Sequence, residues 1–234
     1  MFNFWGQNYT TVASLKARAA RATKTLKDAE PVIPHPHTRK MCLTWWGQEW
    51  CNNLESYADY RSRLERGRRY VRSNTVVDLK IFANQVKAKV QGTDLYEVTV
   101  DFAKPKPADI EKIKKLTGNR IANVEMLLKG NFPDELKELF TQNKPGLFPT
   151  PEEIKFDCDC LDWADMCKHV AAVMYGIGIR IDADPLQFFK LRGIDIDEFL
   201  TQVVDDKVAN MLKNIDVKSD RIMKDANVAT IFGI

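Results

Sequence analysis

Four residues in the second half of the chain have the types and the spacing of metal ligands. In a stretch that begins at Phe156, one Cys-x-Cys motif is followed, after six intervening residues, by one Cys-x-His motif. The four residues are Cys158, Cys160, Cys167 and His169. Residues two apart in a strand point to the same side, so Cys158 and Cys160 can bind one ion together. Positions two apart in a helix diverge by about 200°. Cys167 and His169 therefore converge only if Cys167 lies in the turn before a helix and His169 in its first turn.

Three thiolates and one imidazole form the ligand set of a closed, tetrahedral zinc site. A catalytic zinc keeps one coordination position for water or substrate, and four protein ligands leave none. We therefore predict one structural Zn²⁺ that stabilises this segment by on the order of several kcal/mol or more. A catalytic metal, or no metal at all, are the alternatives.

The spacing of these ligands resembles that of the SWIM-type zinc finger, in which Cys-x-Cys is followed after a gap by Cys-x-His. The surrounding sequence is similar to that of bacterial SWIM zinc finger family proteins in four stretches: LTWWGQEW from Leu43, RGRRYVRS from Arg66, CKHVAAVMYGIG from Cys167 and DPLQFFKLRGI from Asp184. The resemblance covers roughly residues 43–194 and carries over to all four metal positions. It implies association with SNF2-type helicase/ATPases and with DNA or protein partners.

The composition is that of a soluble globular protein, with 234 residues of which 44% are apolar and 29% charged. It excludes collagen, wholesale disorder and a disulfide-rich miniprotein. No apolar run reaches the roughly 18 residues of a membrane helix, and the first ten residues lack the features of a signal peptide. Five cysteines without a secretion signal indicate a reducing, cytoplasmic compartment. We expect Cys42 and Cys51, which flank a tryptophan-rich segment, to be buried core thiols.

The charge is unevenly distributed along the chain. Up to Gly130 there are 23 Lys/Arg and 13 Asp/Glu, a net charge of +10, whereas the remainder has 12 and 19, a net charge of −7. The zinc-thiolate group and its four neighbouring aspartates make the predicted finger acidic, and phosphate binding depends mainly on Lys and Arg. We therefore expect nucleic acid, with DNA favoured, to bind the first half, and a protein partner to bind the acidic half.

The best candidate for a nucleic-acid contact is the arginine-rich segment Arg61–Arg72. If residues 66–73 are extended, the side chains alternate between two faces, with arginines around one tyrosine. Guanidinium groups beside an aromatic ring suit contact with the backbone together with stacking on bases. The predicted contacts are Arg66, Arg68, Arg69, Tyr70 and Arg72. The alternative is that the tyrosine lies in the core and the arginines pair with Glu65, Asp78 or the acidic second half.

Three segments precede the arginine-rich one. Ser14–Glu30 is alanine-rich and basic, which predicts either a loosely docked helix or a mobile arm. A proline-rich linker follows from Pro31, and we expect His35 and His37 within it to be solvated rather than to bind metal. A stripe at helical spacing then predicts a helix whose apolar face lies in the core; its members are Trp46, Trp50, Leu54 and Tyr57.

The remaining elements frame the cluster. We predict three strands, which form an antiparallel meander with one solvent-exposed face: Val76–Phe82, Gln85–Gln91 and Leu95–Phe102. Short helices follow at Asp109–Leu116, Ile121–Lys129 and Asp134–Gln142. Glycines are expected to end two helices, at Gly67 in the arginine-rich segment and at Gly176 or Gly178 behind the cluster. A helix starts at Asp184-Pro185 and ends at Gly193, and Asp195-x-x-Glu198 resembles a capping box that opens the next one.

Together these elements predict an α+β fold: an antiparallel β-meander packed by helices, followed by a zinc-bearing ββα (SWIM-like) unit and C-terminal helices. The expected units are a basic arm and linker (1–40), an α+β domain (41–150), the finger with its following helix (151–194) and a helical tail (195–234). The chain lacks the phosphate-cradling, HExxH and GxSxG motifs. We therefore expect a non-enzymatic zinc adaptor that contacts nucleic acid and docks a protein partner such as a SNF2-type ATPase, with no membrane or small-molecule partner. A pure protein-interaction subunit is the alternative, and a metal-dependent hydrolase is a weaker third.

Overall fold

The computed structural model describes residues 11–56, 61–108, 110–111 and 148–195, and positions 197–198, 201, 205, 208–209 and 212. In chain order the elements are α1 (Val12–Thr25), α2 (Trp45–Ser56), α3 (Arg61–Arg72), β1 (Val76–Phe82), β2 (Gln85–Gln91), β3 (Leu95–Phe102), η2 (Pro151–Glu153), β4 (Ile154–Cys158), α7 (Lys168–Ala183) and α8 (Leu186–Leu191). Tyr57, most of the three helices predicted between residues 109 and 142, and most of the predicted C-terminal tail lie outside the described residues.

The predicted meander is present with the predicted bounds. Strands β1, β2 and β3 pair in antiparallel fashion as neighbours in the sheet. Leu79, Val86 and Val100 are buried on one face, whereas the residues directly before and after each of them in the strand are exposed or half-buried. Because side chains alternate between the two faces of a strand, this pattern leaves one face towards solvent and one towards the core.

Strand β4 is the fourth strand of this same sheet. It pairs antiparallel with β3, with Val98 opposite Cys158 and Phe102 opposite Ile154. The predicted ββα unit requires a separate hairpin. The strand that carries the first cluster cysteine is instead part of the larger sheet. It is continuous with the meander through hydrogen bonds that cross the proposed domain boundary near residue 150. The structure thus has an α+β fold with one four-stranded antiparallel sheet.

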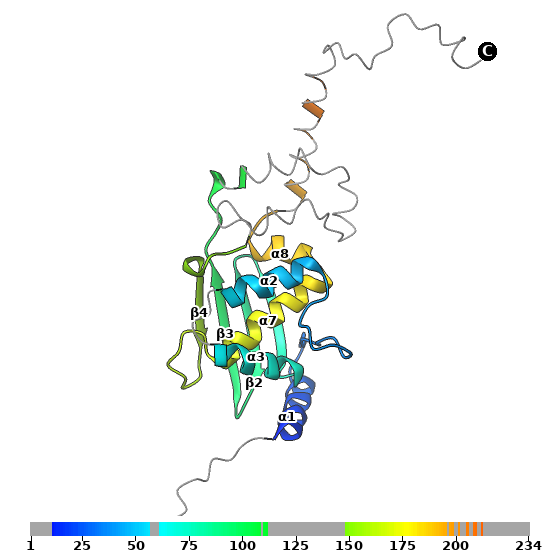
Figure 1. The fold of residues 1–234 in the computed structure, drawn as a ribbon, viewed down its shortest axis with the longest axis vertical. Coiled ribbons are helices and arrows are strands. Elements are labelled where there is room, and N and C mark those ends of the chain that lie inside the picture. Colours follow the sequence, from blue (N-terminus) through cyan, green and yellow to red (C-terminus); the bar gives the residue numbers. More distant parts are fainter. Residues whose placement is uncertain are drawn as a thin grey trace, which may run out of the picture.

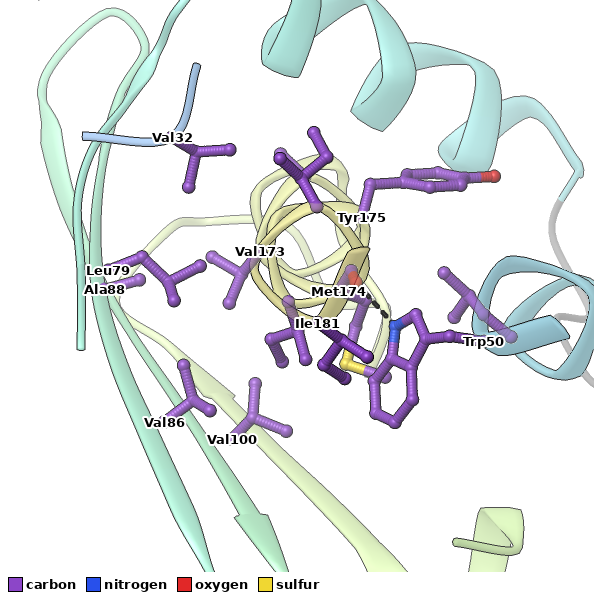
Figure 2. Close-up of a cluster of buried hydrophobic side chains, with 14 of the residues drawn as sticks. Val32, Trp50, Leu79, Val86, Ala88, Val100, Val173, Met174, Tyr175 and Ile181 are labelled. Carbon is purple, nitrogen blue, oxygen red and sulfur yellow. Dashed lines mark hydrogen bonds between the residues drawn. The ribbon is translucent and has the colours of Figure 1, made fainter. Parts of the chain in front are cut away.

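Helix α7 is the centre of the core. Figure 2 shows it end-on, between the sheet with Leu79, Val86 and Val100 on one side and α2 with Trp50 on the other. Of its 16 residues 13 are buried, because it is apolar on nearly every side. The helix does not end at Gly176 or Gly178, as predicted, but continues to Ala183. A Cβ at Gly176 would lie 2.9 Å from Leu79 Cδ1, and one at Gly178 2.9 Å from Trp50 Cδ1, so both glycines allow close packing.

Helices α2 and α3 cover the side of α7 that faces away from the sheet (Figure 1). The predicted stripe is confirmed for Trp50 and Leu54, which are buried, and Trp46 is half-buried. Gly67 does not end the arginine-rich helix, because α3 runs through it to Arg72. A Cβ at Gly67 would lie 2.6 Å from the Cβ of Ala171, so this glycine lets α3 approach α7 closely.

The N-terminal segments pack against the edge of the sheet. Leu15 and Ala19 of α1 are buried, and the guanidinium of Arg18 donates to the carbonyl of Thr93, 3.1 Å away in the β2–β3 turn. This identifies the basic segment as a docked helix. Residues 30–32 then run along β1, where Val32 N–H donates to Val76. None of the helices in the described ranges is long and apolar enough to span a membrane.

Helix α8 follows α7 after a short turn. The carboxylate of Asp184 accepts a hydrogen bond of 3.0 Å from the N–H of Leu186, which confirms the predicted start at Asp184-Pro185. Gly193 has a φ of 64°, a left-handed conformation that ends the helix as expected. Phe188 and Phe189 of α8 are buried, and the ring of Phe188 packs edge-on against that of Trp50 in the core.

Candidate metal centre

The four predicted metal ligands meet at one end of α7. Strand β4 ends at Cys158, Cys160 follows in the next loop, and Cys167 and His169 lie at the start of the helix. Their ligand atoms all lie within 4.8 Å of one another. The local prediction for the second pair is confirmed, since Cys167 is the residue that caps the helix and His169 is in its first turn. The structure therefore brings together a set that could hold a metal ion.

The spacing of the ligand atoms fits tetrahedral coordination. Metal–sulfur bonds of about 2.3 Å and metal–nitrogen bonds of about 2.0 Å place a sulfur and a nitrogen of a tetrahedral site roughly 3.5 Å apart. The Sγ of Cys158 lies 3.8 Å from the Nδ1 of His169. Cys167 and His169 are buried, and Cys158 and Cys160 are half-buried. Thiolate-rich sets of this kind favour soft metal ions over Mg²⁺ or Ca²⁺.

Hydrogen bonds from other cluster residues and from the helix N-terminus lower the pKa of one of these thiols. The Sγ of Cys167 accepts a hydrogen bond of 3.4 Å from the N–H of Val170, an otherwise unsatisfied donor of the first turn. Hydrogen bonds from Cys158 above all, then from His169 and Val170, lower the pKa of the Cys167 thiol to about 3 despite its burial. The hydrogen bond to Cys167, together with burial, raises the pKa of Cys158. This lowered pKa favours the thiolate form of Cys167, which is the form that binds metal.

Aromatic rings hold the imidazole in place. The ring of His169 stacks on Tyr96, with centroids 4.1 Å apart, and Tyr70 meets it edge-on at 5.4 Å. The Nε2 of His169 is buried and has no hydrogen-bond partner among the described residues. It faces Gly92, where a Cβ would lie 3.1 Å from Nε2. Nδ1 is therefore the nitrogen that faces the thiols, and packing rather than a carboxylate orients the ring.

Sequence reasoning missed two residues of this site, Tyr96 and Gly92. Tyr96 appeared only as part of a strand pattern, and Gly92 only as a turn residue. Both lie where β2 turns into β3, about 60 to 75 residues before the ligands, so no local spacing connects them with the cluster.

The loop between Cys160 and Cys167 is tied to α3. We call residues 159–166 the cluster loop. In it, the two carboxylate oxygens of Asp162 meet both terminal nitrogens of Arg63, at 2.8 and 3.0 Å. Both side chains are mostly buried, so this bidentate pair is stronger than an ordinary surface ion pair. One predicted alternative, pairing of α3 arginines with the acidic second half, is thus confirmed for Arg63.

The arginine-rich segment does not have the predicted extended form. Because it is helical, its side chains do not alternate around Tyr70, which packs against His169 and is half-buried. Arg68 pairs with Glu55 at 3.3 Å and lies over the ring of Tyr175. The other three predicted contacts share an exposed stripe of α3, which we call the α3 stripe; they are Arg66, Arg69 and Arg72. The guanidinium of Arg72 also donates to the carbonyl of Arg39.

Two other predicted features lie away from the cluster. His35 is not simply solvated, because its Nε2 donates to the carboxylate of Asp182 at 2.9 Å, whereas His37 is exposed. Cys42 and Cys51 are buried as expected, with their sulfurs 3.6 Å apart. The hydrogen bond to Cys51, together with burial, raises the pKa of Cys42, so this thiol stays protonated.

Comparison with known proteins gives one distant relative. No protein-family model matches the chain, and no solved structure matches it. The chain is 29% identical over 163 residues to the uncharacterized protein Rv2102 of Mycobacterium tuberculosis, an alignment that covers 68% of this chain. It spans 58% of the length of that relative. The chain is therefore similar over most of its length to a mycobacterial protein that is itself uncharacterized.

Proposed function

We propose that this protein is a non-catalytic adaptor built around one structural zinc ion, with a SWIM-like finger at its centre. The observation that carries the proposal is the convergence of three thiols and one imidazole. Zinc is the ion that best suits this donor set in a tetrahedral geometry. When bound, it supplies a cross-link between β4, the cluster loop and α7.

A structural rather than a catalytic role follows from the number of ligands. Four protein donors complete a tetrahedral shell, so no position is left for a water nucleophile or a substrate. Ring packing by Tyr96 and Tyr70 also covers the imidazole. The resemblance to SWIM zinc finger proteins supports the same conclusion.

For nucleic acid, the α3 stripe is the surface we propose. Its three guanidinium groups are exposed, while Arg63 and Arg68 are occupied by Asp162 and Glu55. A second basic surface lies on α1, whose exposed cations include Arg18 and Arg21. The two helices are close to the same end of the sheet, because Arg18 contacts Thr93 and the N–H of Gln91 donates to Thr75, just after α3. Clustered exposed cations are what backbone binding to DNA requires.

The partner we propose for the acidic half is a protein, and the resemblance points to a SNF2-type helicase/ATPase. Motor activity would then come from that partner. The alternative remains a protein-interaction subunit that does not bind nucleic acid. That alternative is favoured by the intramolecular pairs of Arg63 and Arg68, which remove two of the α3 arginines from ligand binding.

The test combines metal analysis with DNA binding. The purified protein should contain one zinc per chain. It should bind duplex DNA with an affinity that falls as salt rises, by about 0.9 in log K per log unit of salt for each phosphate contact. Replacing Arg66, Arg69 and Arg72 by Ala should lower the affinity at least tenfold and reduce that slope.

A matched control removes the same charge from the exposed face of the sheet. Lys80, Lys87 and Lys155 lie on this face, and their replacement by Ala should change DNA binding little. If the protein does not bind DNA at low salt, or if the two triple variants bind equally, the nucleic-acid half of the proposal is wrong. Absence of zinc would instead contradict the adaptor model at its base.

A further inference from the structure

Two large apolar side chains of the cluster loop point into solvent. Leu161 is 104% exposed and Trp163 is 80% exposed, the highest values among the large apolar residues in the described part of the chain. The other described tryptophans are buried or half-buried. Exposed tryptophan is uncommon on monomeric surfaces, whereas tryptophan is enriched among the residues that dominate protein–protein binding.

The loop that carries this pair is fixed at several points. Cys160 and Cys167 anchor its two ends in the metal cluster. Between the two apolar side chains, Asp162 is held by both nitrogens of Arg63 and accepts a bond of 3.4 Å from the N–H of Ala164, which is itself buried. Since the backbone is already ordered, little conformational entropy is lost when the side chains bind.

We propose that Leu161 and Trp163 insert into an apolar pocket on a partner protein, and that the rim of this pocket is basic. The inference rests on the proposed function, because it names the surface and the chemistry by which the acidic half docks its protein partner.

Charge complementarity identifies the occupant. Three aspartates around the loop are exposed, namely Asp157, Asp159 and Asp165, whereas Asp162 is neutralised by Arg63. Three thiolates around one Zn²⁺ add a further negative charge. Phosphates would be repelled here, so nucleic acid is disfavoured in spite of the exposed aromatic ring. Lys and Arg around an apolar pocket would pair with the three carboxylates and would fix the direction of docking.

The first experiment maps the contact in the full-length, zinc-loaded protein. Trp163 is replaced by the photo-crosslinking residue p-benzoylphenylalanine, and the same residue replaces Ile33 as a control, because Ile33 is 70% exposed but lies in the linker. After irradiation in the native cells, the crosslinked peptides are sequenced by mass spectrometry. We expect the crosslinker at position 163 to capture one partner protein. The crosslinked peptide of that partner should contain apolar residues next to Lys or Arg. The crosslinker at position 33 should not capture this protein. Crosslinks only to nucleic acid or to a second copy of the chain, or equal capture from both positions, would overturn the proposal.

The second experiment measures affinity for the purified protein that supplied the crosslinked peptide. The double variant Leu161→Ser/Trp163→Ser should raise the dissociation constant at least tenfold while retaining one zinc per chain. A matched control, Val12→Ser/Ile33→Ser, removes two exposed apolar side chains elsewhere and should change it less than twofold. Asp157→Asn/Asp165→Asn should weaken binding several-fold and reduce its salt dependence. Unchanged binding by the loop variant would reject the docking surface.

Failure of the docking inference can be distinguished from failure of the proposed function. If the loop variant binds its partner normally while zinc is stoichiometric and the α3 stripe variant loses DNA, only the docking inference is wrong. If the wild-type protein contains no zinc, the adaptor model itself fails.

Discussion

The two ends of α7 are connected to the rest of the molecule by different chemistry. At the N-terminal end, Cys167 and His169 join two cysteines in the candidate metal centre. At the C-terminal end, the buried carboxylate of Asp182 accepts hydrogen bonds from the N–H groups of Leu43 and Thr44, at 3.0 and 2.7 Å. The hydroxyl of Thr44 and the Nε2 of His35 also donate to it. The first arrangement is a ligand set that could hold a metal ion, whereas the second is complete within the chain.

Apolar packing explains why the two ends differ. In its middle and towards the C-terminal end, α7 packs against tryptophans whose indole N–H groups also bond to it, Trp50 to the carbonyl of Met174 and Trp46 to that of Ile181. The cluster loop contributes little apolar surface to the core, since Leu161 and Trp163 face solvent. A segment that buries little apolar surface needs another source of stability, and the proposed zinc ion would supply it. The comparison predicts that substitutions at the N-terminal end of α7 abolish zinc binding, whereas substitutions at its C-terminal end lower stability without loss of zinc.

Loss of the ion should have the largest effect. We expect Cys167→Ser to abolish stoichiometric zinc binding and to lower the free energy of unfolding by at least about 4 kcal/mol, since structural zinc contributes strongly to folding. Metal analysis and thermal unfolding would measure this. Cys51→Ala serves as the control, because it removes a buried thiol outside the cluster and should leave one zinc per chain. Full zinc occupancy in Cys167→Ser would contradict the assignment.

Removal of the buried carboxylate of Asp182 should cause the next largest loss of stability. Asp182→Ala leaves several donors without an acceptor and should cost about 3 kcal/mol without loss of zinc, whereas Asp182→Asn should cost less. Chemical denaturation with zinc analysis distinguishes this from a metal-site defect. Asp165→Asn, which changes an exposed carboxylate, should have little effect on stability.

The pH dependence of that loss has a definite sign. Burial alone would raise the pKa of Asp182, but hydrogen bonds from Thr44, Leu43 and His35 outweigh burial and leave it below its usual value. A carboxylate with a lowered pKa stabilises the folded state above its unfolded pKa, and this contribution disappears as the pH falls through the folded value. The stability gap between wild type and Asp182→Asn should therefore narrow below about pH 4. A gap that widens in acid would contradict this account.

Replacing the glycine at the contact between α3 and α7 should have a smaller effect on stability. Its sign should be opposite to the one that helix propensity predicts. Alanine in place of a mid-helix glycine usually stabilises by about 1 kcal/mol. Gly67→Ala should instead destabilise by about 1–2 kcal/mol, because its Cβ would lie 2.6 Å from that of Ala171 and force α3 away from α7. Denaturant unfolding would test this, with Ser62→Ala on the exposed side of α3 as the control. A stabilised Gly67→Ala variant would show that the two helices separate easily.

The smallest effect concerns the anchor of the cluster loop. Arg63→Ala should lower stability by about 1 kcal/mol, because it breaks a bidentate pair with Asp162 that is mostly shielded from solvent. It should also speed the transfer of zinc to a chelator several-fold, since the loop that carries Cys160 is then less restrained. Arg69→Ala, an exposed arginine on the same helix, should leave the transfer rate unchanged.

The amino-acid sequence by itself determined the features that depend on neighbouring residues. The bounds of β1, β2 and β3 follow from apolar alternation, which reports directly on the two faces of a strand. The convergence of Cys167 and His169 follows from the geometry of a helix N-terminus. The start of α8 follows from the side chain of Asp184, which reaches a backbone N–H two residues away.

Only the tertiary structure decided the roles of Gly67, Gly176 and Gly178. Gly67, and either Gly176 or Gly178, were predicted to end helices, yet all three lie inside helices, at positions where a distant side chain or helix leaves no room for a Cβ. In the same way, β4 joins β3 rather than a local hairpin, and the predicted alternation of arginines around Tyr70 is absent because the segment is helical and Arg68 pairs with Glu55. These outcomes depend on contacts between residues far apart in the chain. Local spacing carries no information about such contacts, and the packing around α7 decides them.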